Sequence, residues 1–126
     1  MLGLFTVFGR SREQQQLDQL VRAAGLHPRL MPEAVKLTAI KLLKESHGGA
    51  VPERGYEAAA ELLSYCMLGT QVFAESNGQD RTRAVEDRID AALETGDTLD
   101  ARLVLLTLHA GVAERSVVDR YGLEAG

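Results

Sequence analysis

The stretch YEAAAELLSYCMLGTQVF, residues 56–73, constrains the fold more than any other part of this sequence. Past its first turns it is apolar nearly all round when wound as a helix, and such a helix is normally surrounded by protein. Pro52 precedes it and favours a helix start, so we predict a central helix over about 53–77. Gly69 lies inside this range, where glycine costs about 1 kcal/mol against alanine, and close approach of another helix is the usual compensation.

A second stretch of the same kind, LDARLVLLTLHAGV, covers residues 99–112. It is also apolar on nearly every side, and Asp97 stands where a capping residue is expected. The pattern predicts a second central helix over about 97–112.

Shorter helices are expected around these two. Ser11 and Gln14 have the spacing of a capping box, which predicts a helix over 12–24. The others are predicted from Pro32 to about 46, over 80–95 and over 115–121. No run alternates between apolar and polar residues, so no sheet is predicted. The fold class is therefore all-α, a compact bundle of five to six helices in a single domain, residues 1–126, with an apolar segment at 1–10.

The helix expected over 80–95 divides into two faces at helical spacing. Its buried stripe is predicted to consist of Val85, Ile89, Ala92 and Leu93. Its solvent face is predicted to consist of Arg83, Glu86, Asp87, Asp90 and Glu94.

Composition sets further bounds. Aromatic residues make up 5% of the chain and there is no Trp, so the core must be mainly aliphatic. Cys66 is the single cysteine, which excludes an intramolecular disulfide and a multi-cysteine zinc site. No apolar run is long enough to span a bilayer, and we expect a soluble cytoplasmic protein without membrane association.

Charge is spread unevenly along the chain. Residues 1–54 carry eight Lys or Arg and five Asp or Glu, a net charge of +3, whereas residues 55–126 carry six and thirteen, a net charge of −7. Such asymmetry could guide head-to-tail association or repel nucleic acid from one end, and the simpler explanation is a chance difference in charge between solvated helix faces.

Two helices that are apolar all round need more cover than four short helices supply, and a homodimer would provide it. Candidate contact residues are Leu4, Phe5 and Phe8 in the N-terminal segment. Others are Lys36, Lys41 and Lys44, predicted on the sides and back of the second helix, where they would suit an acidic partner or form an ordinary solvated face. The function predicted by elimination is protein–protein contact, chiefly self-association, with no cofactor and no metal.

A DNA-binding alternative rests on residues 103–121, which resemble a helix-turn-helix with Gly111 in the turn. Arg115 and Arg120 would then contact DNA. Against this, residues 103–108 are too apolar for a helix that crosses a phosphate backbone, and the second helix has under two turns for the major groove. The acidic charge of the second half also disfavours phosphate binding, so nucleic acid is not an expected partner.

A second alternative is a ligand-binding or enzymatic bundle with a pocket between the two central helices. Its candidate residues are Tyr65, Cys66, Gly69 and His109, with Gly69 allowing a ligand to approach the backbone. A Cys66–His109 pair could supply a nucleophile and its base. A thiol in an apolar helix is more often a small hydrophobic residue.

Overall fold

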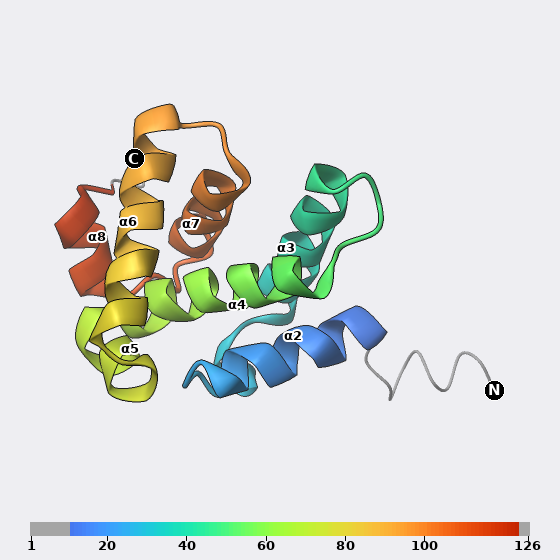
Figure 1. Ribbon diagram of the computed structural model, residues 1–126, viewed down its shortest axis with the longest axis horizontal. Coiled ribbons are helices and arrows are strands. Elements are labelled where there is room, and N and C mark those ends of the chain that lie inside the picture. Colours follow the sequence, from blue (N-terminus) through green and yellow to red (C-terminus); the bar gives the residue numbers. More distant parts are fainter. Residues whose placement is uncertain (1–10, 124–126) are drawn as a thin grey trace.

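The computed structural model describes residues 11–123, and within that range all regular secondary structure is helical (Figure 1). In order they are α2 (Arg12–Ala23), the 3-10 helix η1 (Pro28–Leu30), α3 (Glu33–Ser46), α4 (Glu53–Leu68), α5 (Thr70–Asn77), α6 (Gln79–Thr95), α7 (Leu99–His109) and α8 (Arg115–Tyr121). The predicted all-α class is confirmed, and this range alone holds seven α-helices where five to six were expected. No helix between residues 11 and 123 is long and apolar enough to cross a membrane.

Helix α4 is the central element. Figure 1 shows it crossing the middle of the molecule, with α2 on one side and α6 and α7 on the other, and it packs against α2, α3, α5, α6 and α7. Leu62, Leu63 and Tyr65 in its second half are completely buried. The predicted central position of this segment is confirmed for its first 16 residues.

The single helix predicted over 53–77 is wrong, because the chain turns sharply at Gly69. This glycine has φ 89° and ψ 167°, and Gly78 repeats the geometry with φ 88° and ψ 163°. Residues with a side chain rarely adopt this conformation, so glycine is required at both corners. Helix α5 is thus an eight-residue segment held between two single-residue corners, and only Phe73 of its side chains is buried.

The second predicted central helix is only partly enclosed. Helix α7 contacts α3, α4 and α6, and it buries Leu103 and Val104. Leu105 and His109 are nevertheless exposed, so the expectation of burial on every side is wrong. Its N-cap is Thr98, whose hydroxyl accepts from the backbone N–H of Ala101 at 3.1 Å, and not the predicted Asp97.

Local helix signals were otherwise reliable. The Ser11 hydroxyl accepts from the Gln14 backbone N–H at 3.1 Å, which confirms the capping box. Pro32 and Pro52 stand at the N-cap positions of α3 and α4, one residue before the helical range begins. In the core, the rings of Tyr65 and Phe73 pack edge to face with centroids 5.6 Å apart.

Candidate functional site

A polar cluster lies where α4, α5, α6 and α8 meet, buried at its centre and open to solvent on the side of Arg120. We call it the Glu86 cluster, and its members are Tyr65, Thr70, Glu86, Arg120 and Tyr121. The Tyr65 hydroxyl and the Thr70 hydroxyl each donate to Oε2 of Glu86 at 2.7 Å. A guanidinium nitrogen of Arg120 lies 3.4 Å from Oε1 of the same carboxylate, and the Tyr121 hydroxyl lies 3.5 Å from that of Tyr65.

Glu86 was predicted on the solvent face of its helix, and this is wrong. It is 8% exposed, and its carboxylate is enclosed by hydroxyl groups and one guanidinium. The residue lies 100° from Val85 around the helix, at the edge of the apolar stripe, so its position carried a weak signal of burial. A buried carboxylate is tolerated only when hydrogen bonds or an opposite charge compensate it, and both are present here.

The two tyrosine hydroxyls of the cluster are poor acid–base groups. Burial is the main reason that the pKa of Tyr65 lies above its ordinary value, and its hydrogen bonds to Tyr121 and Glu86 raise it further. Burial also raises the pKa of Tyr121. Both therefore stay protonated at neutral pH and act as hydrogen-bonding groups within the fold.

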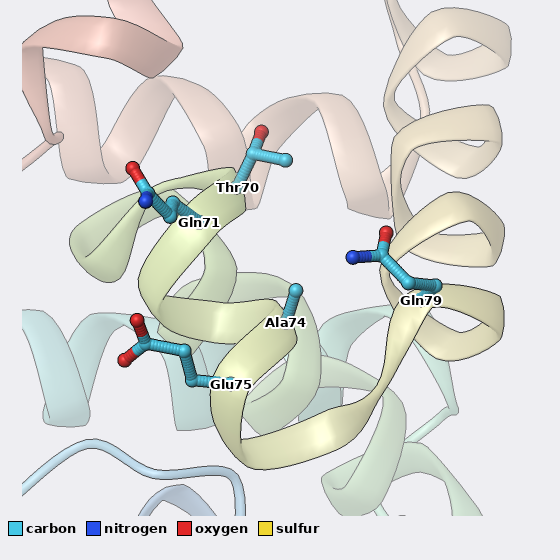
Figure 2. A pocket seen from close by; sticks show the side chains of 5 residues that line it. All are labelled: Thr70, Gln71, Ala74, Glu75 and Gln79. Carbon is cyan, nitrogen blue, oxygen red and sulfur yellow. The ribbon is translucent and has the colours of Figure 1, made fainter.

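A groove of about 460 Å³ adjoins this cluster, and we call it the α5 groove. It is lined by Thr70, Gln71, Ala74, Glu75 and Gln79. Figure 2 shows Thr70 and Ala74 on the side of α5 nearer α6, with Gln79 reaching back toward them, and Gln71 and Glu75 on the other side. Most of the exposed lining is apolar, and the side chains of Gln71, Glu75 and Gln79 add a few hydrogen-bonding groups.

The predicted pocket around Tyr65, Cys66, Gly69 and His109 is not assembled as expected. Tyr65 and Gly69 lie next to Thr70, which lines the α5 groove. Cys66 is completely buried and burial raises its pKa to about 12, with the Thr107 hydroxyl as its hydrogen-bonding neighbour. His109 is exposed at the end of α7. A protonated, buried thiol has no nucleophilic character, so this geometry does not support a Cys66–His109 pair.

Gly69 is approached closely by another element, as its position predicted. A Cβ atom built on Gly69 would lie 2.9 Å from Oε2 of Glu114 and 3.0 Å from Oγ of Ser116, at the start of α8. The Glu114 carboxylate accepts one hydrogen bond from the Ser116 hydroxyl and one from the Ser116 backbone N–H. Both lower the pKa of Glu114, the hydroxyl more strongly. The Glu114 N–H also donates to the backbone oxygen of Cys66 at 2.7 Å, so α8 begins directly against the corner.

The three candidate lysines of α3 have different environments. Lys36 was expected on the helix exterior, and this is wrong: it is 2% exposed, and its ammonium lies 2.8 Å from Oδ1 of Asp18 on α2. Lys44 is partly exposed and lies 3.2 Å from Oε2 of Glu13. Lys41 is exposed to solvent. A lysine face therefore does not form, because two of the three ammonium groups bind carboxylates of α2.

Instead, the exposed side of α3 is mixed in character. We call it the α3 face, and its members are Glu33, Ala34, Leu37, Thr38 and Lys41, all exposed and spaced to share one side of the helix. Leu37 at its centre is 52% exposed, and Leu30 in η1, just before the helix, is 64% exposed. These two leucines are the most exposed large apolar side chains among residues 11–123.

Arg115 and Arg120, the arginines of the helix-turn-helix alternative, both lie on α8 near carboxylates. Helix α8 covers Arg115–Tyr121, as predicted, and Val117 packs it into the core. Arg115 lies 3.3 Å from Oδ1 of Asp119, and Arg120 belongs to the Glu86 cluster. Both guanidinium groups have carboxylate partners, which reduces the positive charge that could attract phosphates.

Leu4, Phe5 and Phe8 lie outside the described residues. Within residues 11–123, no group of three or more His, Cys, Asp or Glu side chains is arranged to hold a metal ion. Comparison of the chain with protein-family models, with curated proteins and with solved structures gave no significant match.

Proposed function

We propose that this protein acts by contacting another protein surface, a second copy of itself included, rather than by chemistry of its own. The observation that carries the proposal is Leu37, whose side chain is half-exposed at the centre of the α3 face. A single exposed leucine is ordinary on a protein surface, and what favours an interface here is its place between acidic and basic residues on one helix face.

The environment of the reactive groups supports the same proposal. The thiol of Cys66 is buried with a raised pKa, and the hydroxyls of Tyr65 and Thr70 are directed at Glu86. Each of these groups is engaged in holding helices together. Thr70 is the one of the three that lines the α5 groove, and its hydroxyl donates to Glu86, which leaves it poorly placed to attack a substrate.

A second candidate function, binding of a small polar ligand, is favoured by one observation. The α5 groove presents the amides of Gln71 and Gln79 and the carboxylate of Glu75 around a volume of about 460 Å³. Because the rest of the exposed lining is mostly apolar, a ligand with an apolar body and one or two hydrogen-bond donors would suit it. The candidate moves the ligand site from the predicted position between α4 and α7 to the junction of α5 and α6.

Native mass spectrometry of the purified full-length chain separates the two functions. We expect a dimer without any adduct, with a monomer fraction that grows on dilution. A monomer that carries a stoichiometric small molecule or metal would overturn the interaction proposal and support the groove. A bare monomer at every concentration would overturn self-association. The mass under denaturing conditions is the control, because it shows whether an adduct is covalent.

A further inference from the structure

The charges of the α3 face are arranged symmetrically about Leu37. Glu33 lies four residues before it and Lys41 four residues after it, so both occupy the same side of the helix about one turn away. The face is therefore acidic at the N-terminal end, apolar in the middle and basic at the C-terminal end.

When two copies of this face pack in antiparallel orientation, the acidic end of each copy lies against the basic end of the other. Resting on the proposed function, we infer that the partner is a second copy of this chain, docked by its α3 face in antiparallel orientation, with the two-fold axis next to Leu37. In that arrangement Leu37 meets its own counterpart, and Lys41 of each copy lies opposite Glu33 of the other. Two ion pairs then flank one apolar contact.

The surroundings of the two charged groups fit this role. Lys36 and Lys44 bind Asp18 and Glu13 of the same chain, whereas Lys41 makes no ion pair with any of residues 11–123. On the acidic side, Oε1 of Glu33 accepts from the Gln14 amide at 3.0 Å, which holds the carboxylate in place at the end of the face. Ala34 and Thr38 are small, so a second helix can approach closely between the charged ends.

A charge-swap series tests the pairing. Lys41→Glu and Glu33→Lys each place like charges opposite one another twice per dimer, because the interface is isologous. We expect either single variant to raise the dimer Kd at least about tenfold, and the double variant E33K/K41E to return it to within about threefold of the original value. The Kd is measured by analytical ultracentrifugation over a dilution series.

Arg83→Glu is the matched control for Lys41→Glu, because it makes the same charge change at an exposed position on α6. It is expected to leave the Kd unchanged. Thermal unfolding of each variant at low concentration shows whether the monomer still folds, which matters for Glu33 because its substitution also removes the hydrogen bond from Gln14. Single swaps that leave the Kd unchanged, or a double variant no better than the singles, would overturn the α3 pairing.

Cross-linking gives a second, independent test. Leu37→Cys places one exposed thiol beside the proposed axis, where the two copies come within the Cα separation of about 4–7 Å that a disulfide requires. The native Cys66 is buried and does not compete. We expect Leu37→Cys to form a disulfide-linked dimer on mild oxidation, and Val72→Cys, 44% exposed on α5, to do so far more slowly.

The outcomes also separate this inference from the proposed function. A dimer that resists every α3 variant but dissociates in Phe5→Ser/Phe8→Ser would place the contact in the N-terminal segment. That result would overturn the α3 pairing and leave self-association standing. A wild-type chain that is monomeric at every concentration would overturn the α3 pairing and self-association, and the proposed function would then require a different protein as the partner.

Discussion

The Tyr65 hydroxyl on α4 and Oε2 of Glu86 on α6 are joined by a hydrogen bond of 2.7 Å, across the short helix α5 that connects the two elements. The Thr70 hydroxyl at the start of α5 donates to the same oxygen. One carboxylate oxygen therefore ties together three consecutive helices whose directions change at Gly69 and Gly78. Hydrogen bonds to a charged acceptor are stronger than neutral ones, which suits a junction of this kind.

Removing the Glu86 carboxylate, which accepts both hydrogen bonds, is predicted to lower the free energy of unfolding more than removing the Tyr65 hydroxyl, which donates one of them. Tyr65→Phe leaves Glu86 with Thr70 and Arg120, and we expect it to lower the free energy of unfolding by about 1–2 kcal/mol. Glu86→Ala leaves two hydroxyls and a guanidinium without their acceptor, and we expect a loss of about 2–4 kcal/mol. Urea unfolding measures both values. Additivity in Tyr65→Phe/Glu86→Ala would contradict the contact, because groups that share a hydrogen bond are coupled.

The two glycine corners offer a matched comparison. Gly69→Ala and Gly78→Ala force alanine into nearly the same backbone conformation, which costs about 1–3 kcal/mol in each case. The added Cβ at Gly78 meets nothing within 4 Å, whereas at Gly69 it would press on Glu114. Gly69→Ala should therefore lower stability by about 1 kcal/mol more, the cost of disturbing a helix cap. Equal losses in urea unfolding would show that the start of α8 moves aside without cost.

Removing Asp18 and removing Lys36, which form the buried ion pair between α2 and α3, should lower the free energy of unfolding by different amounts. Asp18→Ala leaves the Lys36 ammonium buried without its carboxylate, and we expect a loss of about 3–5 kcal/mol. Lys36→Met replaces the buried charge with an apolar chain of similar length, so the loss should be smaller. Lys44→Met, in the exposed pair with Glu13, is the control and should change stability by less than about 1 kcal/mol. An Asp18→Ala variant as stable as the control would contradict burial of Lys36.

Burial of Cys66 predicts low thiol reactivity and a loss of stability in alkali. Its pKa is about 12 in the folded chain against 9.0 ordinarily, so between these values the unfolded state releases a proton that the folded state retains. The associated stability is complete below pH 9 and declines as pH rises toward 12. Cys66→Ala should reduce this decline, measured by urea unfolding across that pH range. Rapid labelling of the native thiol by a disulfide reagent at pH 8 would contradict the assignment.

Signals that act within one turn of the chain were readable from the sequence. The capping box of Ser11 and Gln14, and the bounds of α6 and α8, agree with prediction to within one residue. These features depend on backbone N–H groups and carbonyls no more than four residues away, so local spacing determines them. The apolar composition of α4 likewise determined that this helix lies at the centre.

The environments of charged side chains were decided by tertiary structure. Glu86 and Lys36 were expected in solvent because ionised groups are rarely buried alone. Each became buried because a distant residue compensates it: Asp18 binds Lys36, and hydroxyls from α4 and α5 bind Glu86. Nothing within a helical turn of either residue reveals that partner.

Gly69 shows both contributions at one position. Its presence inside an apolar helix indicated that another element comes close, and the start of α8 does so. Whether the helix continues or turns there depends on the balance between an unbroken α4 and the interactions that form when α5 folds back. Phe73 packing on Tyr65 joins α5 to α4, and Thr70 binding Glu86 joins α5 to α6, so both form only after the chain has folded back on itself. The sequence by itself determined where the helices form, and long-range packing decided where the chain turns and which charges are buried.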